Sequence, residues 1–382
     1  MKLHFTAAEA SGDLLARETI EALMQRAPEA EFVGIGGMEL AKLGIYSPID
    51  TAPLSIVGLF DGMRVYREVL ELSDAAADHI IEADPDAAIL VDSWGFCIRV
   101  GERVRARAPH IRLVKLLGPQ IWATRPGRAR ILAKTFDQVL CAHLMELAYY
   151  EDLDIRAEPI GVPALSRGRE GDRNAFFTRG GLDPERPVLL VLPGSRGSEI
   201  RRVAPALIAA ARQIAEQRPD VQGVVLPASS VRAAFVSAFP TLPVGVSLLP
   251  EDQIAADAMA AADYALACSG TVTTEVALQG TPMLAAYKLG WMTWAVARAG
   301  LYRPKRITLM NIAAGDADIV PEFVQSGMRP SIMAETAMKM LDDEQARQRQ
   351  VDAQFEALGA MGRGDAPAPG RAADAILAGL SR

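Results

Sequence analysis

The sequence is poor in the residues that build metal centres and disulfide frameworks. Its 382 residues include three cysteines, Cys97, Cys141 and Cys268, and four histidines, all of them far apart along the chain. No CxxC or HExxH spacing occurs, which excludes a disulfide scaffold and the common zinc motifs. We therefore expect a reducing compartment and no structural metal.

Basic charge and long apolar runs are also scarce. Lys and Arg number 40 against 47 Asp and Glu, and the net charge of −7 argues against a general nucleic-acid-binding protein, which needs a basic face. Residues 1–5 lead directly into an acidic segment, so we expect no secretory signal. Lys288 and Arg298 interrupt the longest apolar candidate, residues 282–302, so no transmembrane helix is expected.

The chain instead alternates short apolar runs with Gly- or Ser-containing turns and helical periods, which predicts α/β architecture with parallel sheets covered by helices. Expected strands occupy residues 3–7, 32–35, 87–91, 112–117 and 139–142, and then 188–192, 221–226, 246–249, 264–268 and 283–287.

The length exceeds what one hydrophobic core usually organises, and residues 161–173 are aperiodic and rich in Gly and Arg. We therefore predict two Rossmann-like domains, residues 1–165 and 172–350, with a cleft between them. Residues 351–382 are expected to form a flexible stretch and a helix. That helix either crosses back to the first domain or swaps with another protomer.

The motif LPGSRGSE at residues 192–199 follows an apolar strand. Gly194 and Gly197 let a ligand approach the backbone, whose N–H groups around Ser195 can face an anion. Arg196 adds a guanidinium that suits phosphate oxygens. Pro205 fits only in the first turn of the following helix, so residues 193–203 are expected to be mostly loop. The alternative is a plain Gly-rich turn with a surface arginine.

The motif CSGTVTTE at residues 268–275 repeats the arrangement of strand, small polar turn and helix start. Thr271 is the candidate N-cap, and Glu275 is expected in the first turn. There Glu275 either accepts hydrogen bonds from a ribose or only interacts with the helix dipole.

The first half carries carboxylates at its strand ends. The turn AEASGD at residues 8–13 suits sugar hydroxyls, although Ser11 or Asp13 acting only as a helix cap is the alternative. Asp92 ends an apolar strand at the carboxyl edge facing the predicted cleft, where it could act as a general base or be structural. The glycines of GIGG at residues 34–37 do not match the dinucleotide-binding spacing, so we reject that interpretation.

Together these motifs resemble the lipid-A-disaccharide synthase family, in consistent order from about residue 5 to residue 340. The elements that carry the resemblance are Glu9 with SGD at 11–13, VGIGGM at 33–38, LSIVGL at 54–59, Val91-Asp92 with Phe96, PQIWA at 119–123 with Arg125, LPGSRGSE at 192–199, SGT at 269–271 with Glu275, Asn311, and Pro321-Glu322 with Gln325.

The resemblance implies a GT-B glycosyltransferase fold, inversion at the transferred sugar, and no metal or other cofactor. It implies UDP-2,3-diacylglucosamine as donor and the acylated glucosamine 1-phosphate as acceptor, in lipid A biosynthesis in a Gram-negative bacterium. Carried over by motif, the catalytic residues are Asp92 and Arg196. The implied donor-binding residues are Gly194, Ser195, Gly197, Glu199, Ser269, Gly270, Thr271, Glu275, Asn311 and Gln325, and the implied acceptor-binding residues are Glu9, Ser11, Gly12, Asp13, Trp122 and Arg125.

The chain departs from the family pattern mainly in acceptor-side and junction segments. SWGFC at 93–97 replaces a PDF-like segment, Thr124 replaces a second Trp, Val162 replaces the His of Gly-His-Pro, and LME at 144–146 replaces Pro-Phe-Glu. Two alternatives therefore stay open. One is a UDP-sugar enzyme of another class, such as an epimerase or a transferase to a soluble acceptor. The other is a diverged binding protein without activity.

An acylated substrate also needs an apolar surface. Two stretches offer one: Ile56, Val57, Leu59, Phe60 and Met63, and then Trp291, Met292, Trp294, Val296, Leu301 and Tyr302, followed by Arg303, Lys305 and Arg306. Aromatic residues beside cations suit an anionic bilayer surface, although both stretches could be core helices. We predict peripheral association with the inner face of the cytoplasmic membrane and leave a homodimer open.

Overall fold

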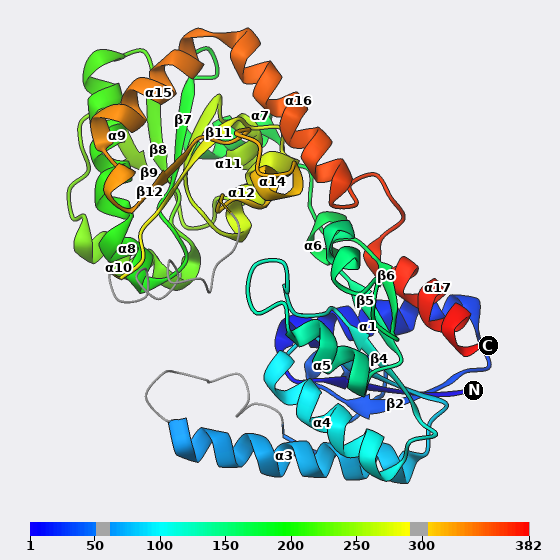
Figure 1. Cartoon of the computed structure of the whole chain (residues 1–382). Helices are drawn as coiled ribbons and strands as arrows, with labels where there is room; N and C mark the ends of the chain where they lie inside the picture. Colours follow the sequence, from blue (N-terminus) through cyan, green and yellow to red (C-terminus); the bar gives the residue numbers. More distant parts are fainter. Residues whose placement is uncertain (51–61, 291–304, 382) are drawn as a thin grey trace. The chain divides into compact units, whose positions relative to one another are not determined.

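The structure, a computed structural model, describes residues 1–50, 62–290 and 305–381, with residues 62–68 described as backbone (Figure 1). The chain forms two compact units. Unit 1 comprises Met1–Ser166 and Gly364–Arg382, and unit 2 comprises Arg167–Arg363. Each unit contains a six-stranded sheet in which the paired strands run parallel, so the predicted α/β fold class is confirmed.

The sheet of unit 1 has the order β2-β1-β3-β4-β5-β6. Its strands are β1 Lys2–Ala7, β2 Glu31–Ile35, β3 Ala87–Val91, β4 Arg112–Leu116, β5 Gln138–Cys141 and β6 Arg156–Pro159. The side chains of β3 are buried on both faces, as expected for a parallel strand covered by helices on each side.

Two apolar layers cover this sheet. One contains α3 (Gly62–Ala83), α4 (Trp94–Arg107) and α5 (Arg128–Thr135), and the other contains α1 (Ala10–Arg26) and α17 (Ala368–Leu380). The short elements of the unit are α2 (Met38–Ala41), η2 (Leu144–Tyr149) and α6 (Pro163–Ser166).

The sheet of unit 2 has the order β12-β11-β10-β7-β8-β9. Its strands are β7 Val188–Leu192, β8 Gln222–Val225, β9 Val246–Leu248, β10 Tyr264–Cys268, β11 Met283–Tyr287 and β12 Glu322–Val324. Helices α9 (Ala204–Gln217) and α15 (Pro330–Asp342) pack against one face. The other helical elements are α7 Arg173–Gly180, α8 Gly197–Arg202, η3 Ser229–Val231, α10 Arg232–Ala238, α11 Ala255–Ala261, α12 Thr271–Leu278, α14 Leu309–Ala313, η5 Gln325–Gly327 and α16 Glu344–Ala360.

Both sheets reverse their strand order beside their first strand. In unit 1, β2 lies on one side of β1 and β3 on the other, and in unit 2 the corresponding neighbours of β7 are β8 and β10. The loops that follow two such strands leave in opposite directions and open a crevice at the carboxyl edge, where ligands of this fold class bind. The topology therefore places a candidate site at β1/β3 and another at β7/β10.

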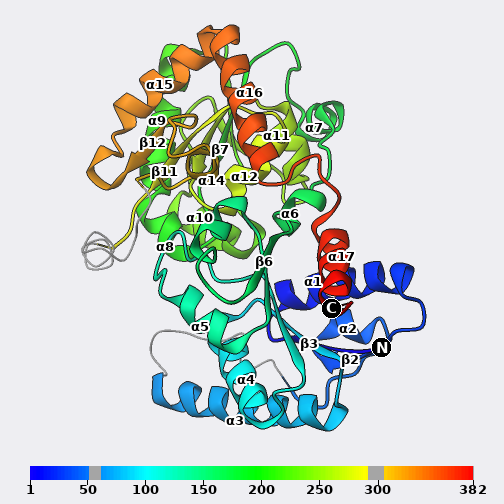
Figure 2. The same ribbon diagram turned by 45° about the vertical axis from the view of Figure 1, so that its right-hand side comes forward.

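The last helix belongs to unit 1. Figures 1 and 2 both show α17 beside α1. Arg26 Nε donates to Asp374 Oδ1 at 2.6 Å, and Gln138 Nε2 donates to the Ala375 carbonyl at 3.0 Å. In this structure the chain's own last helix therefore packs on unit 1.

Two predicted segments differ in detail. The domain limit expected at residue 350 falls inside α16, because that helix begins at an Asp343 cap and continues to Ala360. The expected linker at residues 161–173 contains α6 and ends where α7 begins. Among the described residues, no helix is both long enough and apolar enough to cross a bilayer.

Candidate functional site

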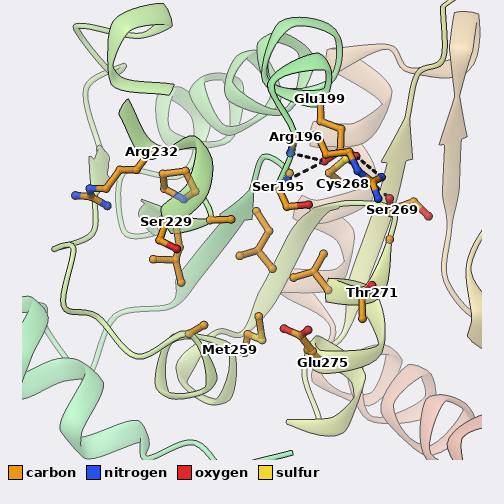
Figure 3. Close-up of a pocket in the computed structure, with 18 of the residues that line it drawn as sticks. Ser195, Arg196, Glu199, Ser229, Arg232, Met259, Cys268, Ser269, Thr271 and Glu275 are labelled. Atoms are coloured by element: carbon orange, nitrogen blue, oxygen red, sulfur yellow. Dashed lines mark hydrogen bonds and ion pairs between the residues drawn. The ribbon is translucent and has the colours of Figure 1, made fainter. Parts of the chain in front are cut away.

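A pocket of about 600 Å³ opens at the β7/β10 crevice of unit 2 (Figure 3). The loop after β7 and the loop after β10 each supply part of its wall, as the strand order requires. Eleven residues of this half were expected to bind nucleotide or catalyse transfer, and the structure brings eight of them together here. Those that line the pocket are Gly194, Ser195, Arg196, Glu199, Ser269, Gly270, Thr271 and Glu275, whereas Gly197 is absent from the lining.

The remaining walls come from residues that the sequence analysis missed. Ser229 and Arg232 follow β8, and Glu251 and Gln253 follow β9. Arg232 Nη2 donates to the Leu249 carbonyl at 2.8 Å, which joins the two loops. The predicted strands at 221–226 and 246–249 carried the necessary signal, because loops after neighbouring parallel strands gather at one edge.

Glu199 has a different role from the expected ligand contact. Its buried carboxylate accepts the N–H of Ser195 at 2.8 Å and the N–H of Arg196 at 3.1 Å, and it pairs with the Arg196 guanidinium at 3.3 Å. The two N–H groups predicted to face an anion are therefore satisfied within the loop. The expectation of mostly loop at 193–203 is also wrong, because this carboxylate caps the short helix α8.

Gly194 is required for this arrangement. Its φ is +118°, and a Cβ there would lie 2.6 Å from the side chain of Glu199. With the backbone closed around Glu199, the guanidinium of Arg196 is the part of the loop that remains available to an anion, and its side chain is 73% exposed.

The turn after β10 also differs from expectation. Helix α12 begins at Thr271 with Gly270 as N-cap and without a side-chain cap, so Thr271 is the first helical residue. Glu275 consequently lies in the second turn, beyond the strongest part of the helix dipole. Figure 3 shows it near Met259 on the side of the pocket away from Arg196. Although Glu275 is exposed, the surrounding pocket walls raise the pKa of its carboxyl group through desolvation.

Asn311 and Gln325 lie outside this pocket. The fully buried Asn311 donates from Nδ2 to the Val320 carbonyl and to Glu322, both at 2.8 Å, and its Oδ1 accepts the N–H groups of Ile319 and Val320. All hydrogen-bonding positions of this amide are occupied, so the expected contact with a donor sugar is corrected to a structural role. Gln325 follows β12 with φ +54°, and its Nε2 is buried without a partner among the described residues.

In unit 1 the β1/β3 crevice brings Glu9, Ser11, Gly12 and Asp92 to one edge. Glu9 and Ser11 are exposed at the start of α1, and Glu9 is its N-cap. Gly12 packs closely on Asp92, since a Cβ on Gly12 would lie 3.7 Å from that of Asp92. Asp92 and Ser93 have φ of +50° and +30°, a strained conformation for non-glycine residues that is found at functional sites more often than elsewhere.

The side chain of Asp13 makes a different contact, with the start of α2. It is 4% exposed, and its carboxylate accepts the N–H groups of Gly37 at 2.9 Å, Glu39 at 2.7 Å and Leu40 at 3.3 Å. The expected acceptor contact is therefore corrected, because Asp13 caps α2 instead. This contact explains a glycine of the GIGG segment. A Cβ on Gly36 would lie only 2.6 Å from Asp13 Oδ1, so a larger residue would not fit there.

Lys115 is a residue near Asp92 that the sequence analysis missed. Its side chain is fully buried in β4, and Nζ donates to the carbonyls of Leu90 at 3.2 Å, Leu116 at 3.4 Å and Asp92. Burial lowers the pKa of this ammonium group. A lysine inside an apolar strand prediction was the available signal, because lysine is rarely fully buried without a partner.

The last two residues predicted to bind the acceptor, Trp122 and Arg125, lie in the loop after β4 and differ in exposure. Trp122 is 7% exposed and stacks edge-on against His143 with ring centroids 5.7 Å apart, so its indole is part of the core. Arg125 is exposed with φ +52°. The sequence analysis missed Arg128, whose guanidinium lies 4.7 Å from the Trp94 ring centroid. Burial and the charge of Arg125 lower the pKa of Arg128.

Within the described part of the chain, no group of three or more His, Cys, Asp or Glu side chains could hold a metal ion. The apolar stretches around residues 56–60 and 291–302 lie outside the described residues, as does the side chain of Met63.

Solved structures with related folds have low sequence identity. A putative UDP-N-acetylglucosamine 2-epimerase from Listeria monocytogenes aligns with a TM-score of 0.64 at 15% identity, covering 100% of this chain and 95% of that one. MurG from Acinetobacter baumannii aligns with a TM-score of 0.55 at 17% identity, covering 99% of each chain. These similarities show the two-domain GT-B type fold.

Sequence relatives are much closer. A protein of Solibacter usitatus named lipid-A-disaccharide synthase is 36% identical over 382 residues, covering 98% of this chain and 96% of the relative. One from Rhodospirillum centenum with the same name is 34% identical over 373 residues, covering 97% and 92%. The model of the lipid-A-disaccharide synthetase family matches residues 3–374, and the chain therefore belongs to this family of glycosyltransferases.

Proposed function

We propose that this chain transfers 2,3-diacylglucosamine from UDP to 2,3-diacylglucosamine 1-phosphate, with inversion and release of UDP, as a step of lipid A biosynthesis. The observation that carries the proposal is the unit 2 pocket. Its walls contain the two strand-end loops, and the chain belongs to a family whose members are named for joining the lipid A disaccharide. A cavity of this size, lined by the guanidinium groups of Arg196 and Arg232 and by several polar groups, suits a nucleotide sugar.

On the donor side, Arg196 faces the diphosphate and stabilises the charge that develops on departing UDP. Ser269, Gly270 and Thr271 form the wall beside it, and Glu275 lies toward the ribose or uracil. Gln325 remains a proposed contact of the donor sugar, because its amide nitrogen has no partner among the described residues.

On the acceptor side, Asp92 accepts the proton of the attacking hydroxyl. The new glycosidic bond forms at the anomeric carbon as the bond to UDP breaks, so the configuration inverts and no covalent enzyme intermediate is required. Glu9 and Ser11 contact acceptor hydroxyls.

The acceptor also carries a phosphate. Arg125 and Arg128 are near enough for their charges to interact, and neither has a carboxylate partner among the described residues. Two neighbouring cations in a protein of net charge −7 provide the positive charge that a phosphate needs, and the stack on Trp94 fixes one of them. We assign these two arginines to the acceptor phosphate.

A transfer assay tests the reaction. The purified protein is mixed with UDP-2,3-diacylglucosamine and the acylated 1-phosphate acceptor, and both UDP and disaccharide are measured. Equal amounts of both products support the proposal. Turnover of the donor without this acceptor indicates a UDP-sugar enzyme of another class, and nucleotide binding without turnover indicates a binding protein. Either of the last two outcomes overturns the proposal.

We also propose that the protein works at the inner face of the cytoplasmic membrane, where acylated substrates partition. The apolar stretches around residues 56–60 and 291–302, the latter followed by basic residues, support this proposal by composition. Flotation with anionic vesicles tests it: the protein should float with them and should be released when Trp291 and Trp294 are both replaced by Ser. Failure to float excludes the proposal, and light scattering of the same sample tests for a homodimer.

A further inference from the structure

The ammonium group of Lys115 lies directly beneath the turn that carries Asp92. Three main-chain carbonyls accept from it, and they belong to Leu90, Asp92 and Leu116 at the carboxyl ends of β3 and β4. An ammonium group has three N–H donors, so its hydrogen-bonding capacity is used completely. No carboxylate forms a hydrogen bond or ion pair with it among the residues that the structure describes.

These contacts account for the unusual backbone at the strand end. Asp92 and Ser93 both adopt positive φ, which turns the chain sharply from β3 into α4. The Asp92 N–H still bonds to the Leu116 carbonyl at 2.9 Å, while the Asp92 carbonyl is held by Lys115. The side chain of Lys115 thus fixes this turn through the Asp92 carbonyl. Such strain persists only where neighbouring contacts hold it.

The charge of Lys115 also acts on the groups around it. The titratable groups that face it are the Cys97 thiol of α4, the Asp92 carboxylate after β3 and the Glu9 carboxylate at the start of α1. The Cys97 side chain donates to the Val91 carbonyl and is buried.

We propose that Lys115 is a positioning residue for Asp92: its ammonium group, bonded to three carbonyls at the ends of β3 and β4, fixes the strained turn that presents the Asp92 carboxylate to the acceptor hydroxyl. The inference rests on the proposed function, in which Asp92 is the general base. No contact between Lys115 and substrate is needed, since its side chain is fully buried.

The test replaces Lys115 with Met, which keeps length and burial but removes the charge and the donors. We expect kcat to fall by about tenfold to a hundredfold, a part of the total effect of a general base, with KM for both substrates changed less than about threefold. Lys115→Gln, which keeps two of the three donors, should recover part of the lost kcat, as expected if the hydrogen bonds to the turn carry the effect. UDP affinity should stay unchanged.

Gln138→Met is the matched control. Gln138 is also fully buried in the unit 1 sheet, and it bonds to Glu158 and to the Ala375 carbonyl, away from Asp92. This variant should keep the wild-type kcat. If Lys115→Met does not fold, Lys115→Gln serves instead, because it keeps two donors without the charge. An unchanged rate, or a further loss of the same size in the Asp92→Asn background, overturns the proposal.

Asp92→Asn separates this inference from the proposed function. If that variant keeps normal transfer, Asp92 is not the base, and the proposed mechanism fails. If Asp92→Asn loses transfer while Lys115→Met behaves as wild type, only the role of Lys115 fails. Where both roles hold, Lys115→Met should cause no further loss in the Asp92→Asn background, because its effect passes through that carboxylate.

Discussion

At the scale of single residues, the sequence predicted which residues gather at one edge of the unit 2 sheet better than it predicted their individual contacts. Arg196, Glu275 and Ser269 line one pocket as the strand-end rule predicts. Asp13, Asn311 and Glu199 were predicted from the same set of motifs, but their side chains accept hydrogen bonds from backbone N–H groups of the protein. A motif identifies polar residues that are important to the protein, but it does not show whether their side chains bind a ligand or the protein's own backbone.

Arg196→Ala should remove most turnover and leave the fold intact. The guanidinium is the exposed cation of the pocket loop, and loss of one group that stabilises a leaving phosphate costs about 10²- to 10³-fold in kcat. Steady-state rates and circular dichroism check this. Arg201→Ala, an exposed arginine on α8 that does not line the pocket, should retain normal rates. Near-normal turnover of Arg196→Ala would falsify its role.

Arg128→Gln should weaken recognition of the acceptor phosphate. We expect KM for the 1-phosphate acceptor to rise about tenfold, with kcat reduced much less and UDP affinity unchanged, because one charge-assisted contact is worth about 1.5–3 kcal/mol. The comparison that decides is discrimination between phosphorylated and dephosphorylated acceptor, which should shrink. Arg130→Gln, exposed on the same helix, is the control. Unchanged discrimination in Arg128→Gln would exclude the assignment.

At the scale of elements, apolar strands were predictable and polar ones were not. The predicted strands at 87–91, 188–192, 264–268 and 283–287 match the observed bounds, because each is a buried run. The edge strands β6 (RAEP) and β12 (EFV) were missed, because half-buried edge strands lack such a run. The helix start after β7 was placed too late, because Glu199 caps α8 from its own first turn, and α2, which the carboxylate of Asp13 caps, was not predicted.

The short helix η2 provides a test of stability against pH. Glu146 is 1% exposed, its Oε1 accepts the His143 N–H at 3.0 Å, and its Oε2 has no partner among the described residues. Burial raises the pKa of its carboxyl group to about 8. The folded state therefore keeps a proton that the unfolded state releases above its ordinary pKa, so the free energy of unfolding falls as pH rises toward 8.

Urea unfolding of wild type and Glu146→Gln between pH 6.5 and 8 isolates this effect. Burial lowers the pKa of His143 to about 4, so its imidazole gains a proton on unfolding near pH 6.5, but this contribution is present in both proteins and cancels from their difference. The wild type should lose up to about 1.4 kcal/mol per pH unit relative to Glu146→Gln. Glu151→Gln, an exposed neighbour, should keep the wild-type slope. Parallel slopes for wild type and Glu146→Gln would refute a buried protonated carboxyl group.

At the scale of the whole molecule, the chain forms two units, and its last helix returns to the first. Ending the chain after Arg363 removes α17, whose buried side chains include Ala372, Ala373 and Ile376 against the α1 face. Loss of that apolar burial should cost unit 1 several kcal/mol, about 1.5–3 for the isoleucine alone. Unit 2 should still bind UDP.

Calorimetry and UDP titration of the truncated chain check this prediction. The transition of unit 1 should move to lower temperature, while the UDP dissociation constant changes less than about threefold. Asp374→Ala in the full chain is the milder comparison, since it removes only the ion pair with Arg26. Loss of UDP binding on truncation would show that the nucleotide pocket depends on the C-terminal segment.

The sequence by itself determined the fold class, the strands with apolar runs and the two strand-end loops of unit 2, because burial periodicity and glycine-opened turns are local properties. Tertiary structure alone decided which carboxylates remained available to a ligand. Glu275 lines the pocket, whereas the carboxylates of Glu199 and Asp13 accept hydrogen bonds from backbone N–H groups. It also decided that Lys115 lies under Asp92, because that contact depends on the pairing of β3 with β4 and not on separation along the chain.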